Sequence, residues 1–380
     1  MKRDPGPDFL RALAIAWVVM IHCTMVSLGS PIGVAAAAWG WMGVDLFFAL
    51  SGYLIGSQLF KVYAQGGHPS TLGFYRRRAF RILPAYLVVL TLYFTVPLWR
   101  ENPTIAPLWR FLTFTLNLGV DFATSQSFDV AWSLCVEEHF YLFFPLLVWW
   151  LMRRPSGVKT IAVCSVIVAA GLLLRAHIWL HVLRPAVFSP HRTLDLFTLY
   201  LKIIYTPTYL RMDGLLAGVC VAALRWFRPA LWAKAMAHGT LLFACGLALV
   251  AGSMRVFYHA FFDFWPAVFG YPLLDLGMAV LVMASVSPKS PIGRFPIPGI
   301  RALATLAFSI YLTHMTALHL VRLYVPSAVT HHDLKSFLIC GAAVLGLAAA
   351  LYWAVERPFL AWRERLDRRA ARAPSVPSAP

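Results

Sequence analysis

Charged residues are scarce in this chain. Asp, Glu, Lys and Arg together make up 13% of its 380 residues, whereas a soluble domain has about 25%. Hydrophobic residues make up 60%, and many of them stand in long apolar runs. This combination excludes an ordinary soluble fold and predicts an all-α integral membrane protein that crosses the bilayer many times.

Paired cysteines, metal-ligand motifs and phosphate loops are missing as well. The six cysteines are isolated in or beside apolar stretches and include no C-x-x-C pair, so we expect neither a disulfide framework nor a zinc site. Glu137, Glu138 and His139 are consecutive and therefore point in different directions, which is no metal motif. The sequence also has no Gly-rich phosphate loop and no internal repeat, and we expect no metal cofactor.

Acidic residues are few relative to basic ones. The chain has 33 Lys and Arg against 16 Asp and Glu, which gives a net charge of +17. The basic residues do not form one patch, so this charge does not indicate a nucleic-acid partner. They recur between the apolar runs, as expected for a membrane protein whose cytoplasmic loops are positively charged.

Ten apolar segments are long enough to cross a bilayer. The segment 138–152 needs a helical turn from residues 132–137 to reach full length, and residues 105–118 fit a re-entrant or interfacial helix. The ten predicted spans are 9–28, 40–60, 82–99, 138–152, 159–180, 205–224, 231–252, 268–286, 302–324 and 335–354.

The distribution of Lys and Arg predicts the orientation. With the N-terminus inside, every inner segment holds at least three basic residues and the first outer loop holds none. This alternation predicts a multi-pass inner-membrane protein with both termini cytoplasmic. We expect one transmembrane domain over residues 1–362, with its first helix retained rather than cleaved as a signal peptide. Residues 363–380 are basic and rich in Pro, Ala and Ser, which is typical of a disordered cytoplasmic tail.

Arg11 and His22 stand in the first predicted span. Eleven residues are about three helical turns, so both side chains share a face, about 16 Å apart along the axis. If Arg11 marks the membrane surface, His22 lies near the middle of a hydrocarbon core about 30 Å thick. An ionisable group there indicates a functional site, and histidine suits proton transfer near neutral pH. The structural alternatives are a snorkelling anchor for Arg11 and a helix-to-helix hydrogen bond for His22.

Arg78 and Arg81 stand three residues apart where the third span begins. A helical start puts both on one face, and a guanidinium pair suits phosphate because its planar fork donates two hydrogen bonds at once. The predicted side is cytoplasmic, where a soluble phosphorylated donor would be. The alternative is that these charges only set the topology.

Glu137 belongs to a third polar group. Ser133, Glu137 and Tyr141 are spaced four apart and share a helical face. A carboxylate and a histidine brought together would form a base with its orienting group. The alternative is a polar helix start whose carboxylates complement the helix dipole.

Four further residues are weaker candidates for substrate contact or support. Asp45 is an acidic residue near the outer end of an otherwise apolar span, and Arg211 and Asp213 stand at the outer start of the sixth span. His314 is a second intramembrane histidine, for which helix packing is the alternative.

The motifs together resemble those of the integral-membrane acyltransferase 3 family, which includes bacterial O-antigen acetylases, nodulation-factor acetylases and macrolide O-acyltransferases. The resemblance covers about residues 8–362, and six motifs occur in the family's order. They are Arg11 with His22, GVDLFFALSGYLI at 43–55, Arg78 with Arg81, AWSLCVEEHFYLFFP at 131–145, RMDGLLAG at 211–218, and FSIYLTH at 308–314.

The resemblance implies ten transmembrane helices and transfer of an acyl group, usually acetyl, from acyl-coenzyme A to a hydroxyl. It implies His22 as the catalytic base, with Arg78 and Arg81 holding the coenzyme A phosphates. The usual acceptor is a sugar, here in a surface glycan or glycolipid, so the expected partners are acyl-coenzyme A, this acceptor and the lipid bilayer. We expect Glu137 to orient or assist His22, and a stand-alone member of the family. Direct transfer and an acyl-histidine intermediate both stay open.

Two other functions are alternatives. One is O-acylation of a macrolide or another small molecule, which uses the same chemistry on another acceptor. The other is a membrane transporter or flippase of a glycan precursor, which would use the intramembrane charges as a pathway. A transporter predicts an inverted repeat, and the sequence has none.

Overall fold

The computed structural model describes residues 5–25, 37–119, 126–188, 195–294, 297–330 and 334–372. These residues are largely helical, and their β-structure is limited to an isolated bridge between Ile105 and Ser127. The all-α prediction is therefore confirmed. The long helices are α1 Pro5–Met25, α3 Met42–Ala64, α4 Thr71–Thr95, α6 Trp132–Arg153, α7 Gly157–Ile178, α10 Met212–Phe227, α12 Gly239–His259, α13 Tyr271–Ser285, α15 Ile300–Tyr324, α17 Leu334–Leu351 and α18 Arg357–Arg372. The shorter ones are α5 Leu108–Leu112, α8 Arg184–Val187, α9 Leu196–Tyr200, α11 Pro229–Ala237, α14 Pro291–Arg294 and α16 Ser327–Thr330.

The described residues include nine helical segments long and apolar enough to cross a membrane. The pair α10 and α11, bent by 109° at its break, gives a tenth candidate. The prediction of about ten spans is confirmed. Helix α6 begins at Trp132, after a 3₁₀ turn at Asp129–Ala131, so residues 132–137 supply the turn that the predicted span 138–152 needed. In the stretch 105–118 only α5 is helical, so no long re-entrant helix forms there.

The central contact of the bundle joins α3 to α10. Each helix carries glycines four residues apart, at Gly52 and Gly56 in α3 and at Gly214 and Gly218 in α10. A Cβ atom on Gly52 would stand 2.0 Å from the carbonyl oxygen of Leu215, so only glycine permits this approach. Small residues at such spacing let two membrane helices pack backbone to backbone.

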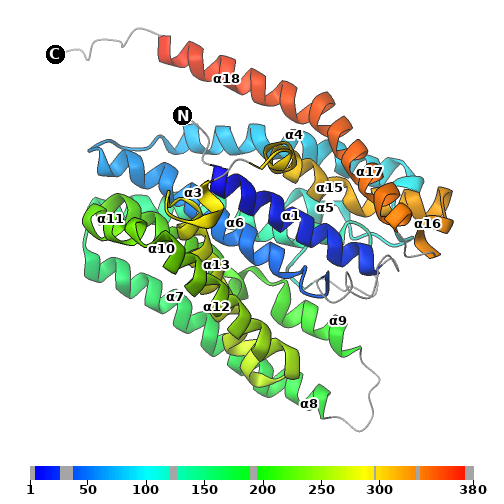
Figure 1. The fold of residues 1–380 in the computed structure, drawn as a ribbon, viewed down its shortest axis with the longest axis horizontal. Coiled ribbons are helices and arrows are strands. Elements are labelled where there is room, and N and C mark those ends of the chain that lie inside the picture. Colours follow the sequence, from blue (N-terminus) through cyan, green and yellow to red (C-terminus); the bar gives the residue numbers. More distant parts are fainter. Residues whose placement is uncertain are drawn as a thin grey trace.

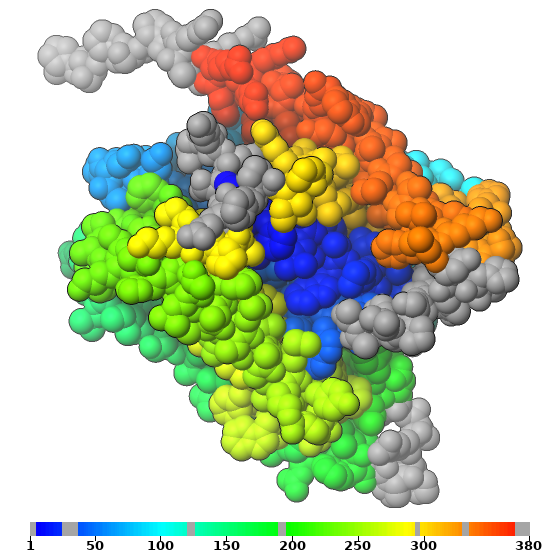
Figure 2. Space-filling model, viewed as in Figure 1, coloured from blue at the N-terminus to red at the C-terminus, as the bar shows by residue number. Residues whose placement is uncertain are grey.

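The other helices gather on two sides of this pair (Figure 1). On one side α10 and α3 pack against α13, which in turn packs against α12. On the other side α1 lies between α3 and α15, and α15 packs against α17. Figure 2 shows the deep-blue surface of α1 between the yellow-green surface of α12 and the orange surface of α17. This arrangement puts α1, which carries His22, between the central helix α3 and the pair of α15 with α17.

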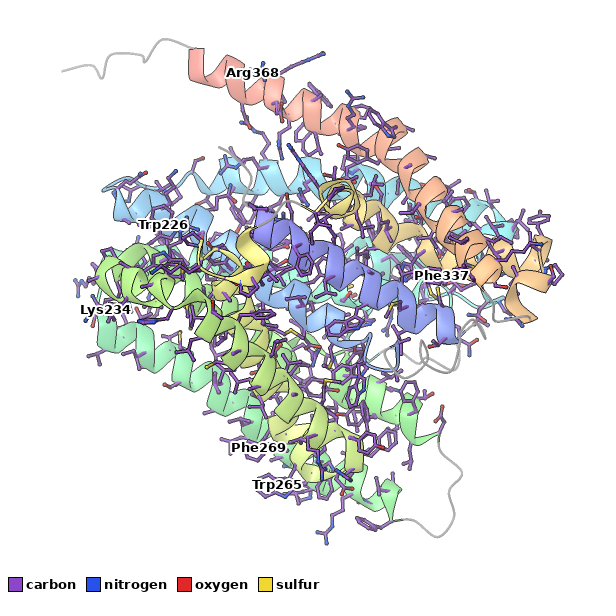
Figure 3. The ribbon with its side chains drawn as sticks, viewed as in Figure 1. Trp226, Lys234, Trp265, Phe269, Phe337 and Arg368 are labelled. Atoms are coloured by element: carbon purple, nitrogen blue, oxygen red, sulfur yellow. The ribbon has the colours of Figure 1, made fainter. Side chains whose placement is uncertain are left out.

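Tryptophan side chains lie at two ends of the bundle. Trp226 and Lys234 lie at one end, whereas Trp265 and Phe269 lie at another (Figure 3). Trp265 and Phe269 are exposed, as is typical of aromatic residues at a membrane surface. Helix α1 begins, and α18 ends, on the same side of the bundle in Figure 1.

Helix α18 lies over α4. Arg76 of α4 forms a 2.5 Å ion pair with Asp367, and Phe80 meets the ring of Trp362 edge-on. The helix continues to Arg372, so residues 363–372, where a disordered tail was predicted, are helical in the structure. Residues 373–380 of that prediction lie outside the described residues.

Candidate active site

Two cavities meet inside the bundle. The first, here called the arginine cavity, has a volume of about 370 Å³, and its charged lining residues are Arg11, Arg78, Arg81 and Glu137. The second, the histidine cavity, has a volume of about 730 Å³. Its lining includes His22, Asp129 and many aromatic rings, among them Trp39, Trp41, Trp132 and Tyr205. Four residues line both cavities and form a shared wall: Val18, Val44, Ser133 and Tyr311.

His22 lies on α1 one turn after Val18, a residue of the shared wall. Its Nδ1 atom is 2.8 Å from the carbonyl oxygen of Val18 and 3.1 Å from Nε2 of His314. The structure thus brings together two predicted site residues that are 292 positions apart. His314 is fully buried on α15, and its Nε2 atom makes this contact across the helix interface.

Glu137 lines the arginine cavity and contacts two hydroxyl groups. Ser51 donates a hydrogen bond to Oε1 over 2.7 Å, and Tyr141 donates one to Oε2, also over 2.7 Å. The predicted helical face of Glu137 and Tyr141 is therefore present. The expected pairing of Glu137 with His22 is absent, because the two side chains line different cavities. Glu137 is hydrogen-bonded to Ser51 and Tyr141, whereas His22 contacts the carbonyl oxygen of Val18.

Ser133 lines the arginine cavity together with Glu137 and Tyr141, as the predicted helical face requires, and it also belongs to the shared wall. Its Oγ atom is 3.1 Å from the hydroxyl oxygen of Tyr311, which donates a 2.6 Å hydrogen bond to the carbonyl oxygen of Val130. Two hydroxyl groups therefore stand where one cavity adjoins the other. Tyr311 was missed by sequence reasoning, although it lies in the FSIYLTH motif three residues before His314.

Arg78 and Arg81 both reach the arginine cavity from α4. Arg78 donates a 3.5 Å hydrogen bond to Gln58, its guanidinium lies 5.3 Å from the ring centre of Tyr141, and its Nε atom has no partner. Among the described residues, neither arginine forms an ion pair. The cavity therefore holds guanidinium groups that can donate hydrogen bonds to an anion.

Arg11 enters the arginine cavity from α1. Its Nη1 atom donates a 2.8 Å hydrogen bond to Asp8, three residues earlier on the same helix. The predicted separation of Arg11 and His22 along one helix is seen, with Arg11 in one cavity and His22 in the other. Helix α1 thus connects the two cavities.

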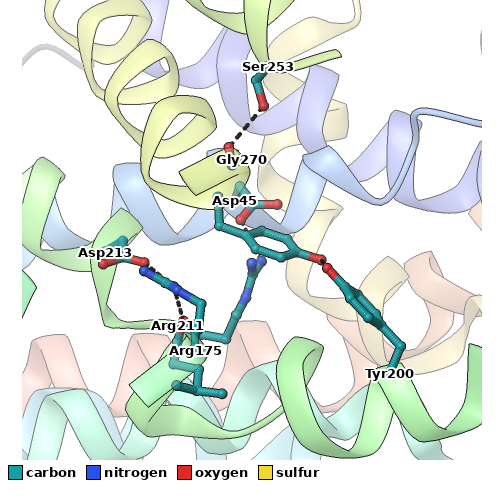
Figure 4. Close-up of polar contacts among 9 residues, drawn as sticks. Asp45, Arg175, Tyr200, Arg211, Asp213, Ser253 and Gly270 are labelled. Carbon is teal, nitrogen blue, oxygen red and sulfur yellow. Dashed lines mark hydrogen bonds and ion pairs between the residues drawn. The ribbon is translucent and has the colours of Figure 1, made fainter. Parts of the chain in front are cut away.

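The three other candidates belong to a buried network that lines neither of these cavities. Arg211 forms a 2.5 Å ion pair with Asp45, and its guanidinium lies 4.2 Å from the ring centre of Tyr271. Asp213 forms a 2.5 Å ion pair with Arg175 of α7. Figure 4 shows both pairs side by side. Asp45, Arg211 and Asp213 therefore connect helices, which fits the support role rather than substrate contact.

The loop between α4 and α6 leads to Asp129, which lines the histidine cavity. Phe128 has a left-handed backbone with φ of 58°, a conformation that a bulky residue rarely adopts. Its backbone N–H donates a 2.8 Å hydrogen bond to Glu101, and its ring stacks on Tyr93 at a centroid distance of 4.5 Å. Burial raises the pKa of Glu101. These contacts fix the chain just before Asp129, which lines the histidine cavity.

The protein is therefore a multi-pass helical membrane protein with two adjoining internal cavities, one lined by arginines and one by His22. A family model described as an acyltransferase domain matches residues 4–354, and the chain belongs to that family. The family resemblance indicated by the motifs is confirmed.

Curated relatives carry the name O-acetyltransferase. The O-acetyltransferase OatA of Staphylococcus aureus (strain NCTC 8325 / PS 47) is 26% identical over 342 residues, which cover 84% of this chain and 51% of the relative. A putative O-acetyltransferase of Staphylococcus aureus (strain COL) is 32% identical over 161 residues, which cover 39% of this chain and 25% of the relative. The chain spans about half the length of OatA. No solved structure matches this chain.

Proposed function

We propose that this protein transfers an acetyl group from cytoplasmic acyl-coenzyme A to a hydroxyl of a sugar in a surface glycan or glycolipid. The observation that carries the proposal is the pair of cavities with a shared wall, one cationic and one holding His22. Membership of the acyltransferase family and the O-acetyltransferase names of the relatives support the same reaction.

The proposal orients the chain with α1 beginning, and α18 ending, at the cytoplasmic face of the inner membrane. The excess of Lys and Arg in the inner segments supports this orientation. The arginine cavity then receives the donor from the cytoplasm, and the histidine cavity receives the acceptor from the opposite side.

In the donor half, Arg78 and Arg81 would bind the phosphates of coenzyme A. Phosphate suits them because each guanidinium can donate two parallel hydrogen bonds, and the cavity gives neither of them a carboxylate within ion-pair distance. Glu137 would hold the cavity wall through Ser51 and Tyr141. The thioester end of the donor would then reach the wall at Ser133 and Tyr311.

In the acceptor half, His22 would act as the general base. It takes the proton of the acceptor hydroxyl while the oxygen attacks the thioester carbon, so that a C–O bond forms and the C–S bond breaks. The departing thiolate takes that proton from the imidazolium and leaves as free coenzyme A. General-base help of this kind contributes about 10²–10⁴-fold in rate.

The test uses membrane vesicles that contain the full chain, radiolabelled acetyl-coenzyme A as donor and a surface-glycan extract of the source cells as acceptor. We expect His22→Ala to lower label transfer by about 10²-fold or more. His319→Ala is the matched control, because His319 lies on α15 but lines neither cavity, and it should transfer at the wild-type rate. A folded, fully active His22→Ala protein would contradict the role of His22. Movement of glycan across the vesicles without acyl-coenzyme A would favour the transporter alternative.

A further inference from the structure

The contact between His22 and His314 indicates which ring nitrogen of His22 carries the proton. His314 lies on α15 with its Nδ1 atom 3.0 Å from the carbonyl oxygen of Ile310 and 2.9 Å from that of Tyr311. Carbonyl oxygens only accept hydrogen bonds, so Nδ1 of His314 must carry a proton to satisfy them. In the neutral ring, Nε2 of His314 is then a bare acceptor.

This bare nitrogen faces His22. Nδ1 of His22 is 3.1 Å from Nε2 of His314 and 2.8 Å from the carbonyl oxygen of Val18. Both neighbours accept, so Nδ1 of His22 must be the donor, and its proton lies between them. The opposite arrangement needs an imidazolium at His314, and no described carboxylate forms an ion pair with either histidine. A buried charge without a partner is costly.

We infer that His314 is a positioning residue that fixes His22 in the tautomer with the proton on Nδ1. The lone pair of Nε2 is then left for the histidine cavity, which His22 lines. The chemistry is that of a base held by an orienting acceptor, with a neutral imidazole in the place that a carboxylate often takes. When Nε2 takes a proton, His314 accepts the hydrogen bond of the resulting imidazolium.

This role is the one expected of Glu137 from the sequence. Glu137 is bonded to Ser51 and Tyr141 in the arginine cavity, so His314 is the residue that reaches His22. The inference rests on the proposed function for its effect on rate. The tautomer itself can be measured without any assay of activity.

The first experiment is nitrogen-15 NMR of the full-length chain in lipid nanodiscs, with histidine labelled and the His22 signals assigned by their loss in His22→Asn. We expect a protonated Nδ1 and a bare Nε2 in the wild-type protein. In His314→Leu, which removes the acceptor but keeps an apolar side chain, we expect the two His22 tautomers to mix. His314→Gln, whose side-chain oxygen can accept, should restore the wild-type pattern. A protonated Nε2 at His22 in the wild-type protein would overturn the inference without any variant.

The second experiment measures transfer from radiolabelled acetyl-coenzyme A in the same proteins. We expect His314→Leu to lower the rate about 10- to 100-fold, the range known for orienting partners of metal-bound histidines, and His314→Gln to recover most of it. His319→Leu on the same helix should have the wild-type rate. An inactive His22→Ala with a fully active His314→Leu would refute only the positioning role. A fully active His22→Ala would refute the proposed base itself, whatever the NMR shows.

Discussion

Two sets of arginines in this bundle differ in their partners. Arg175 and Arg211, in the network between α3, α7 and α10, each face a carboxylate at 2.5 Å. Arg78 and Arg81, in the arginine cavity, have no carboxylate within ion-pair distance among the described residues. The first set is closed off from both cavities, whereas the second set lines one of them.

The difference separates residues that hold the fold from residues that can bind a ligand. An ion pair inside a membrane protein neutralises charges that would be costly alone, and the pair of Asp45 with Arg211 connects α3 to the start of α10 in this way. Arg78 has a long hydrogen bond to Gln58 and a cation–π contact with Tyr141, but no described carboxylate within ion-pair distance. Its charge is left available, which fits an anionic ligand.

The largest effect is expected when the paired set is broken. Asp45→Ala leaves Arg211 buried without its carboxylate, and breaking a buried pair in this way costs about 3–5 kcal/mol. We expect a strong loss of folded protein and a lower Tm in detergent. Asp367→Ala is the matched control, since its pair with Arg76 has the same 2.5 Å distance but is 36–39% exposed, and exposed pairs are worth about 0–1 kcal/mol. Equal Tm shifts in the two variants would mean that the buried ion pair contributes no more to stability than the exposed one.

The sequence predicted the helices well because their signal is local. Long apolar runs and basic loops locate spans without knowledge of their neighbours, and the need of the span 138–152 for residues 132–137 follows from its length alone. Within a helix, spacing also sufficed, since Glu137 and Tyr141 share a face and form a hydrogen bond.

The partners across helices could not be predicted in the same way. His22 and His314 are 292 residues apart, and Asp45 and Arg211 are 166 apart. One sequence does not say which face of each helix meets which neighbour. For this reason Glu137 was expected beside His22, and the contact of Ser133 with Tyr311 of α15 was not predicted.

An intermediate effect is expected when the unpaired set is changed. Arg78→Gln removes a cation from the arginine cavity, and a hydrogen bond to a charged group is worth about 1.5–3 kcal/mol. We expect the KM for acetyl-coenzyme A to rise about 10- to 100-fold, with kcat and Tm close to wild type. Arg77→Gln on the same helix is the control, because Arg77 does not line the cavity. A fall in Tm with an unchanged KM would place Arg78 with the structural set.

The smallest effect concerns Glu101, a buried carboxylate of the loop before α6 that forms no ion pair among the described residues. Burial raises its pKa above the ordinary value of 4.5, so the folded state binds its proton more tightly than the unfolded state does. Its contribution to stability is therefore fully present below pH 4.5 and is lost as the pH rises through the folded pKa. Glu101→Gln keeps an acceptor for the backbone N–H of Phe128 but cannot ionise. We expect the Tm of wild type, relative to this variant, to fall as the pH rises from 4.5.

Asp195 provides the control of opposite sign. Its carboxylate accepts a hydrogen bond from Thr198, which lowers its pKa below the ordinary value of 3.8. Its contribution is present above pH 3.8 and is lost as the pH falls through the folded pKa, so Asp195→Asn should show a difference from wild type that shrinks on acidification. Scanning fluorimetry of wild type and both variants in one buffer series measures the two slopes together. Parallel curves of Tm against pH for wild type and Glu101→Gln would mean that Glu101 has the same pKa in the folded and unfolded states, and would contradict this prediction.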